Sequence, residues 1–282
     1  VRNTPVTIGG TTWKPDLPIV SVIKEELEDI SNKKLNDIDR AVELGMKAVA
    51  ITDHASISEH INAIKYSKEL QSKGIDIKVL LGDEIYLVDD VRDVKENYVP
   101  KQTQFYHFIM IAKDKIGYDQ LREISAVGWQ SSFFTGKMRR VPNDKKQIKQ
   151  IIGENKGHLL VSTACIAGEL AQSFFNKDKV RLQNFVKWCI STFGKDNFAI
   201  EIQPSDNPDQ IAFNKWAKVF AWKHGIKCIF TCDVHYLKKE HHDIHKAFLQ
   251  SRDTDRGETE DFYATTYMMS TEEKRSYMPY FS

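Results

Sequence analysis

The chain has 282 residues, of which 41% are hydrophobic and 28% are charged. This composition is ordinary for a globular protein, and the length suits one large α/β barrel or two modest domains. Forty basic residues against thirty-nine acidic ones leave a formal net charge of +1. No global electrostatic field would therefore draw the chain to nucleic acid, and we expect any contact with DNA to be local.

Targeting signals and cysteine usage indicate the cellular setting. The first stretch, VRNTPVTIGGTTWKPDLP, lacks the basic start and the apolar run of a secretion signal, and no other segment is apolar enough to span a membrane. The four cysteines lie far apart and form no CxxC pair, so we expect thiols rather than disulfides. These features predict a cytoplasmic protein with no membrane partner.

Short apolar strands alternate with helical patterns along the chain. We expect helices at residues 35–44, 60–70, 117–128, 167–193 and 208–223. We expect strands at residues 47–52, 77–82, 106–112, 158–163, 198–203 and 227–232. Two polar segments, 88–104 and 131–144, interrupt the alternation and are expected to be loops. The alternation predicts parallel strands, buried on both faces and arranged in a barrel.

Residues that commonly bind metal ions lie close to the ends of these strands. They are Asp53, His54, Glu84, His107, Cys165, Asp233 and His235. Most of them follow a strand, and the C-terminal strand ends of an α/β barrel meet at one rim, so we expect these side chains to converge. Imidazole and thiolate groups suit zinc, and carboxylates can bridge two ions. The set therefore predicts a metal site at the rim.

Each member of the set also has an ordinary structural explanation. Asp53 alone could cap the helix that follows it. His107 alone could be a core histidine, and Cys165 alone could be a buried structural thiol. Asp233 and His235 are more specific, because residues two apart on a strand point to the same side. The prediction therefore depends on the whole set rather than on any one residue.

Six passages together give the chain a resemblance to a known family. They are AVELGMKAVAITDHASI, LLGDEIYLV, YHFIMIAKDKIGYDQL, LLVSTACIAGEL, KDNFAIEIQPSDNPDQ and TCDVHYL. In order and approximate spacing they resemble the PHP (polymerase and histidinol phosphatase) domain that opens the alpha subunit of bacterial DNA polymerase III. The resemblance runs from about residue 31 to the end of the chain.

The resemblance implies a division of the chain. Residues 1–19 are an N-terminal extension, residues 20–270 form the PHP domain, and residues 271–282 start the connection to the rest of a polymerase. The remaining polymerase domains, or a separate polymerase subunit, would then be partners. Residues beyond about 255 are too few to bury a core of their own, so we expect them to pack against the barrel or a partner.

The resemblance also implies a fold and a site. The fold is α/β, a distorted seven-stranded (βα) barrel similar to a TIM barrel. Its rim binds up to three divalent ions, usually zinc or manganese, that serve phosphoester hydrolysis. Asp53 would be a catalytic helper, and Asp233 would be both catalytic and a ligand. The implied ligands are His54, Glu84, His107, Cys165, Asp233 and His235.

The chain departs from the family in the first strand. The family carries an HxH pair there, whereas the sequence VSV at residues 20–22 lies at or near that place, and no histidine precedes His54. One ion position would keep Asp29, His54 and His235. A second would keep Glu84, His107 and Cys165. The third would keep only two carboxylates and should bind a transition metal weakly, so we expect up to two ions.

Two other groups of residues are less specific. The loop FFTGKMRRVPND resembles a family loop, and its Lys137, Arg139 and Arg140 could contact phosphate groups of DNA, although a solvated basic loop explains them equally well. His241 and His245 have the i, i+4 spacing of metal ligands on a helix. We do not count them, because the family has no ligands there.

Three functions from different classes fit these observations. The first is a structural or partner-binding module of a replicative DNA polymerase, with a partly degenerate metal site. The second is an active metal-dependent phosphoesterase or 3'-5' proofreading exonuclease that uses the two remaining ion positions. The third is a stand-alone small-molecule phosphatase similar to histidinol phosphatase, which the passages TACIAGEL and TCDVHYL disfavour.

Overall fold

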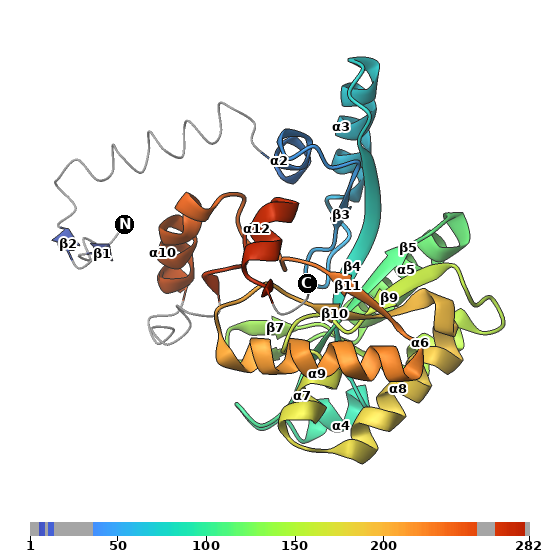
Figure 1. Ribbon diagram of the computed structural model, residues 1–282. Helices are drawn as coiled ribbons and strands as arrows, with labels where there is room; N and C mark the ends of the chain where they lie inside the picture. Colours follow the sequence, from blue (N-terminus) through green and yellow to red (C-terminus); the bar gives the residue numbers. More distant parts are fainter. Residues whose placement is uncertain (1–5, 9–10, 14–35, 253–262, 280–282) are drawn as a thin grey trace.

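A curled sheet forms the centre of the protein, as a computed structural model shows for residues 6–8, 11–13, 36–252 and 263–279 (Figure 1). Its strands follow the order β11-β10-β9-β5-β4-β3, and a seventh strand, β8, pairs with the end of β4. Their bounds are β3 Ala48–Ile51, β4 Lys78–Val88, β5 Tyr106–Ala112, β8 Pro142–Asp144, β9 Leu159–Ser162, β10 Phe198–Ile202 and β11 Lys227–Phe230. The six expected strands are confirmed, although β4 extends further than its apolar run.

One strand runs against the others, so the expected all-parallel arrangement is wrong. β5 is antiparallel to β4 on one side and to β9 on the other, whereas β3–β4, β4–β8, β9–β10 and β10–β11 are parallel. A strand buried on both faces has the same apolar sequence in either direction. The direction of β5 is therefore evident only in the tertiary structure and not in the sequence.

The sheet forms a half-barrel rather than a closed barrel over the described residues. At its two ends, β3 pairs with β4 and β11 pairs with β10. The expected seven-stranded barrel is thus confirmed only as an α/β fold with a curled sheet. Both expected loops contain regular structure, because α4 (Val91–Glu96) lies in the first, and the hairpin β6 (Phe133–Thr135) and β7 (Met138–Arg140) lies in the second, just before β8.

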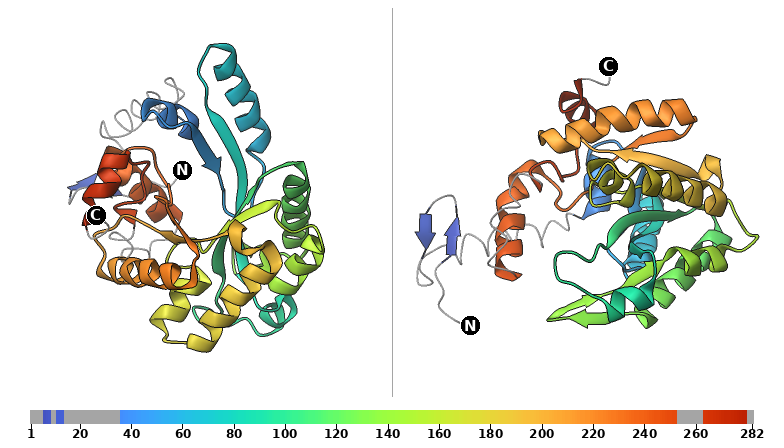
Figure 2. Two further views of the ribbon diagram at one scale, coloured as in Figure 1. Left: turned by 45° about the vertical axis from the view of Figure 1, so that its right-hand side comes forward. Right: turned by 90° about the horizontal axis from the view of Figure 1, so that it is seen from below.

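Helices surround the sheet, and most of them cover its outside, whereas α10 stands away from it (Figure 2). They are α2 Asp37–Glu43, α3 His60–Ser72, α5 Lys115–Gln130, α6 Lys145–Ile152, α7 Glu169–Phe175, α8 Lys179–Phe193, α9 Pro208–His224, α10 His242–Arg252 and α12 Thr271–Ser276, with 3-10 turns at Lys195–Asn197 and Lys239–His241. Side chains cap many of them: Asn207, for example, accepts from the backbone of Asp209, and Gly225 ends α9 at φ 59°. A small hairpin, β1 (Val6–Ile8) with β2 (Thr11–Trp13), precedes them.

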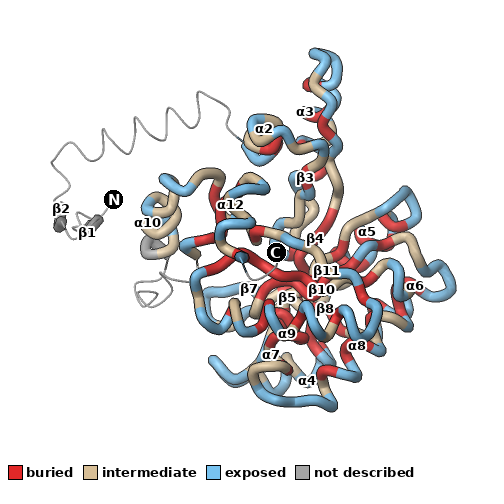
Figure 3. The backbone as a smooth tube through the Cα atoms, viewed as in Figure 1, coloured by how far each residue is buried: buried red, intermediate tan, exposed pale blue. Residues whose placement is uncertain are grey.

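The main core lies between the sheet and these outer helices, where the backbone is buried in Figure 3. Phe108 and Met110 of β5 are fully buried, as are Leu121 and Ile124 of α5. Each such side chain contributes about 1.5–3 kcal/mol by leaving water. Alternate residues on a strand face opposite sides of the sheet. Since Phe108 and Met110 face the outer helices, His107 and Ile109 lie on the inner face. No helix in the described part of the chain is both long and apolar enough to cross a membrane.

The described part of the C-terminal segment packs against the sheet, as expected for residues beyond about 255. Tyr267 is 2% exposed and Met269 is fully buried. The backbone N–H of His235 donates to the carbonyl of Thr266 over 2.7 Å, and Tyr236 and Tyr267 form a parallel bridge. The segment therefore supports the loop that carries His235.

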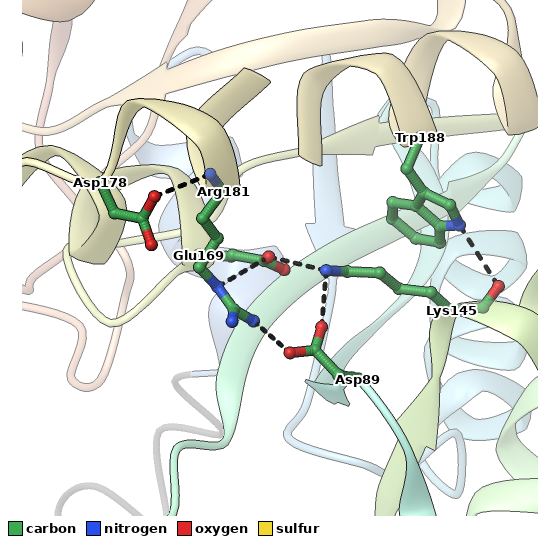
Figure 4. A network of polar contacts seen from close by, with 6 residues as sticks. All are labelled: Asp89, Lys145, Glu169, Asp178, Arg181 and Trp188. Atoms are coloured by element: carbon green, nitrogen blue, oxygen red, sulfur yellow. Dashed lines mark hydrogen bonds and ion pairs between the residues drawn. The ribbon is translucent and has the colours of Figure 1, made fainter. Parts of the chain in front are cut away.

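A partly buried ion network joins three helices to the end of β4 (Figure 4). Glu169 is 1% exposed and lies 2.6 Å from the Lys145 ammonium and 3.1 Å from the Arg181 guanidinium. Asp89 contacts the same two cations at 3.0 and 2.8 Å. Burial raises the pKa of the Glu169 carboxyl, although both cations act in the opposite direction. Two carboxylates balance two cations, so the network is neutral as a whole.

Removal of one charged group should therefore destabilise the protein, because a charge of opposite sign is left without its partner. We expect Glu169→Ala to lower the free energy of unfolding by about 3 kcal/mol, because two cations then share one carboxylate in a partly buried place. Urea unfolding measures the change. Lys115→Ala is the matched control, since Lys115 pairs with Asp119 over 2.6 Å at the exposed surface, and its loss should leave the unfolding midpoint unchanged. Equal effects of both substitutions would contradict a structural role for the network.

Candidate metal centre

The ends of β3 and β4 place the first two candidate ligands side by side. The pairing of these strands continues beyond Ile51, because His54 and Glu84 form a parallel bridge and the N–H of Ala55 donates to the carbonyl of Glu84 over 3.0 Å. The His54 Nε2 atom lies 3.7 Å from a Glu84 carboxylate oxygen. Glu84 is only 5% exposed, so its carboxylate faces the inside of the sheet.

The antiparallel direction of β5 explains why His107 belongs to the same rim. His107 is near the start of its strand, and that end of an antiparallel strand lies beside the C-terminal ends of its neighbours. Glu84 pairs with Ile109 and Tyr86 pairs with His107, which makes Glu84 and His107 diagonal neighbours on one face. The His107 Nδ1 atom lies 2.8 Å from a Glu84 oxygen.

His54, Glu84 and His107 have the composition and the spacing of a metal site. One donor atom from each lies within 4.8 Å of the other two. The rings of His54 and His107 meet edge to face with centroids 4.9 Å apart. Two imidazoles and one carboxylate are a frequent ligand set for zinc and related divalent ions. Side chains far apart in the sequence thus converge as the sequence analysis expects.

The other expected ligands surround this triad. The Cys165 thiol lies 3.5 Å from His107 Nδ1, and the ring of His235 lies 6.3 Å from that of His54. Asp233 lies near His107 and Cys165, since its charge shifts the pKa of both groups. Cys165 is 4% exposed. All six residues that the resemblance implies as ligands therefore gather at one rim.

The backbone is strained where these residues leave their strands. Ala55 has φ 49°, Ala164 has φ 56° and Asp233 has φ 47°. Left-handed backbone costs a non-glycine residue of order 1 kcal/mol or more, and such residues concentrate at functional sites. Here each one adjoins or is a candidate ligand, so the strained turns direct His54, Cys165 and Asp233 into the rim.

The electrostatics of the rim favour a bound cation. Burial and the negative charge of Glu201 raise the pKa of Glu84 to about 8. Burial and the charge of Glu84 likewise raise the pKa of Asp233 above its usual range. The charged groups that shift these two carboxyls are acids and imidazoles, with no lysine or arginine among them. A divalent ion would supply the missing positive charge, so the donor set fits a metal.

The imidazoles are in a suitable state for metal binding. Burial, together with nearby His107 and His235, lowers the pKa of His54 to about 4, so this ring is neutral at physiological pH. The carbonyl of Asp233 accepts a hydrogen bond from His235 Nδ1 over 2.7 Å. A carbonyl only accepts, so Nδ1 carries the proton and Nε2 keeps its lone pair for a metal.

Of the other residues predicted from the sequence, some lie near the rim and others do not. Asp53 lies beside the rim and is half-buried, but α3 begins at His60 with Glu59 before it, so Asp53 does not cap that helix. Arg140 turns toward the rim. Arg139 lies over the Trp129 and Phe134 rings, and Lys137 is exposed in the hairpin turn. Asp29 and residues 20–22 lie outside the described residues.

The structure adds two residues that sequence reasoning missed, Glu201 and Tyr86, and places a third, His245, close to the rim. Glu201 of β10 is a buried interior acid that accepts hydrogen bonds from Ser162, Gln203 and Thr231. A glutamate in the middle of the apolar strand FAIEI was the available signal. The ring of Tyr86 is stacked on His54 at 5.4 Å and 5°. His245, which we discounted, lies 5.6 Å from His235 between ring centroids.

The raised pKa of Glu84 gives a test of the rim's electrostatics. Without metal, the carboxyl is neutral below its unfolded pKa of about 4.5, and the cost of ionising it grows as the pH rises toward about 8. We expect Glu84→Gln to stabilise the metal-free protein at pH 8 by about 1–3 kcal/mol and to have little effect at pH 5. Urea unfolding in the presence of a chelator measures both values.

Glu201→Gln is the matched control for this substitution. Glu201 is equally buried but accepts three hydrogen bonds, so its amide variant should lose stability at both pH values. A Glu84→Gln protein less stable than the wild type at pH 8 would show that the rim does not strain this carboxylate.

Comparisons with known proteins agree with this geometry. The family model of the PHP domain matches residues 31–205. The chain is 37% identical over 272 residues to a probable DNA polymerase of Bacillus subtilis, covering 90% of this chain and 21% of that protein. A DNA-directed DNA polymerase of Bacillus phage SPbeta matches with the same values.

A more distant relative is also a DNA polymerase. The DNA polymerase III subunit alpha of Thermus aquaticus is 29% identical over 238 residues, which cover 82% of this chain and 18% of that subunit. The chain thus spans about a fifth of the length of these curated relatives. The family match covers more than half of the chain and includes His54, Glu84, His107 and Cys165. The chain therefore belongs to the PHP domain family.

Proposed function

We propose that this chain is the PHP domain of a replicative DNA polymerase of the polymerase III alpha kind, and that it holds a divalent metal centre at its rim. The convergence of His54, Glu84 and His107, with donor atoms within 4.8 Å, carries the proposal. Zinc or manganese suits the two imidazoles and the carboxylate. The names and lengths of the relatives support a role in DNA replication as part of a larger polymerase.

The domain in this proposal is first a structural and partner-binding module. The remaining polymerase domains, or a separate polymerase subunit, are the proposed partners. Trp222 and Val219 lie one turn apart on α9 and are 80% and 50% exposed, so they form a small apolar patch that a partner would cover. The proposed location is the cytoplasm, where the four thiols of the chain would remain reduced.

The proposed ions are bound by residues of the rim and by Asp29, which lies outside the described residues. Glu84, His107 and Cys165 form one proposed position, and His54 and His235 form the other with Asp29, so the triad of His54, Glu84 and His107 belongs to two adjacent positions. The missing HxH pair leaves the third position of the family without its imidazoles. The proposal therefore includes up to two ions in a partly degenerate centre.

Phosphoester hydrolysis is the second candidate function, and a specific observation favours it. The rim opens into a groove of about 1100 Å³ that His54, His107 and His235 line together with Arg140. A divalent ion in such a place supplies a Lewis acid for phosphoester chemistry. Asp53 and Asp233 are the proposed acid–base residues, and an exonuclease or phosphoesterase activity would follow.

Metal content tests the proposal most directly. We expect protein purified without chelator to contain about one or two zinc or manganese ions per chain, because the rim offers at least three donors. The double variant His54→Ala, His107→Ala should contain almost none. Mass spectrometry of the metals gives the ratio. His158→Ala is the control, since this histidine binds Asp114 away from the rim, and metal retained in the double variant would refute the assignment.

The pH dependence of metal affinity tests the ligands themselves. Glu84 must lose the proton that its raised pKa retains up to about pH 8, whereas His54 is neutral above about pH 4. Burial also raises the pKa of the Cys165 thiol, so this ligand must release a proton as well. Manganese affinity should therefore rise between pH 6 and pH 8, by up to about tenfold per unit for each released proton. Calorimetric titration in buffers of different ionisation enthalpy counts the protons released. An affinity that stays constant over this range would contradict Glu84 as a ligand.

A further inference from the structure

The turn after His54 is fixed by hydrogen bonds to both polar groups of one residue. Ala55 has left-handed backbone, with φ 49°, and is 6% exposed. Its N–H donates to the carbonyl of Glu84 over 3.0 Å, and its carbonyl accepts from the indole Nε1 of Trp129 over 2.9 Å. The first bond joins the turn to β4, and the second joins it to α5. Since left-handed backbone is unfavourable for alanine, surrounding contacts must hold it in place.

A cavity of about 720 Å³ lies between the same loop and α5. Ser56, Ile57 and Ser58 line one side of it, and residues of α5 line the other side. Trp129 is one of those residues and is 43% exposed. Side-chain packing therefore leaves a gap between the loop and the helix, and the indole N–H supplies a link across it.

His54 is the member of the triad that depends most on its backbone for orientation. Its side chain is 36% exposed, against 22% for His107 and 7% for Glu84. The His54 Nε2 atom lies 3.7 Å from the nearest Glu84 oxygen, which is too far for a hydrogen bond. The direction of the chain at residues 54 and 55 therefore decides where this imidazole points.

The ring of Trp129 is held in turn by the hairpin of β6 and β7. The guanidinium of Arg139 lies 5.5 Å from its centroid, a distance at which a cation is attracted to the face of an indole. The indole N–H lies in the plane of the ring, so the cation does not compete with Ala55 for it. The hairpin thus stabilises the ring and leaves its donor to the turn.

We propose that Trp129 is a positioning residue for His54: its indole N–H holds the Ala55 carbonyl and thereby fixes the direction of the imidazole at the rim. The effect on metal affinity rests on the proposed metal centre, but the orientation of His54 does not. Water from the adjoining cavity can replace the indole N–H at the carbonyl. Loss of the donor should therefore loosen the turn without unfolding the protein.

Removal of the indole N–H alone tests the proposal. Trp129→Phe keeps an aromatic ring and loses the donor. Trp188→Phe is the matched control, because the Trp188 indole also donates to a backbone carbonyl, that of Lys145, over 3.2 Å, and neither residue lines the rim cavities. Visible absorption during cobalt titration of the whole chain measures metal affinity.

We expect cobalt affinity to fall about tenfold in Trp129→Phe, a loss typical for removal of an indirect support of a metal ligand. Trp188→Phe should bind cobalt as the wild type does. Urea unfolding of each variant establishes that the chain is folded. An equal loss of cobalt affinity in both variants would overturn the proposal, since the effect would then be a general one.

A second readout requires no metal. NMR of histidine-labelled protein in the presence of a chelator reports the ring of His54, whose signals are identified by their loss in His54→Ala. These signals should shift or broaden in Trp129→Phe and stay unchanged in Trp188→Phe. The ring of His158, which binds Asp114 over 2.7 Å, serves as the internal reference.

The two readouts separate this proposal from the metal centre. A wild-type chain that binds no cobalt would refute the metal centre, whereas a changed His54 signal in Trp129→Phe would still support the positioning role. An unchanged His54 signal in folded Trp129→Phe would overturn that role, whatever the cobalt affinity is.

Discussion

The contact between Glu84 and His107 connects the sheet to the chemistry of its rim. It joins two strands that run in opposite directions, and it brings an imidazole nitrogen to 2.8 Å from a carboxylate that is almost completely buried. Burial leaves this carboxylate with a pKa of about 8, so its ionised form needs a positive partner. The charged groups that shift its pKa are acids and imidazoles, with no lysine or arginine among them, so a divalent cation would supply the missing positive charge.

The side chains that form the core and the candidate ligands lie on opposite faces of the same strands. Ile85 and Leu87 of β4 are buried in the outer core, whereas Glu84 and Tyr86 line the cavities on the inner side of the sheet, at the rim. The outer core and the neutral network around Glu169 hold the strands in position. This rigid support allows strained turns at Ala55, Ala164 and Asp233 to persist, and those turns direct the candidate ligands inward. Tyr86 on the same strand also lines the groove at the rim.

The C-terminal segment also contributes to the site, although it lies far along the chain. Thr266 accepts a hydrogen bond from the backbone of His235, and Tyr236 pairs with Tyr267. Met268 packs in the cluster that contains β3 and α3, so the same segment contacts both ends of the curled sheet.

The sequence by itself determined the family, the strands and the candidate ligands, because short apolar runs that end in Asp, His, Cys and Glu are local patterns. It did not determine the direction of β5, since a strand buried on both faces has no polar side to reveal its orientation. It missed Glu201 and Tyr86, whose relevance depends on neighbours that are distant in sequence. Only the tertiary structure decided that Arg140 and not Arg139 faces the groove, and that Asp53 is no helix cap. Pairing across a sheet is a long-range property, so the distances that make six scattered residues one site exist only in the folded chain.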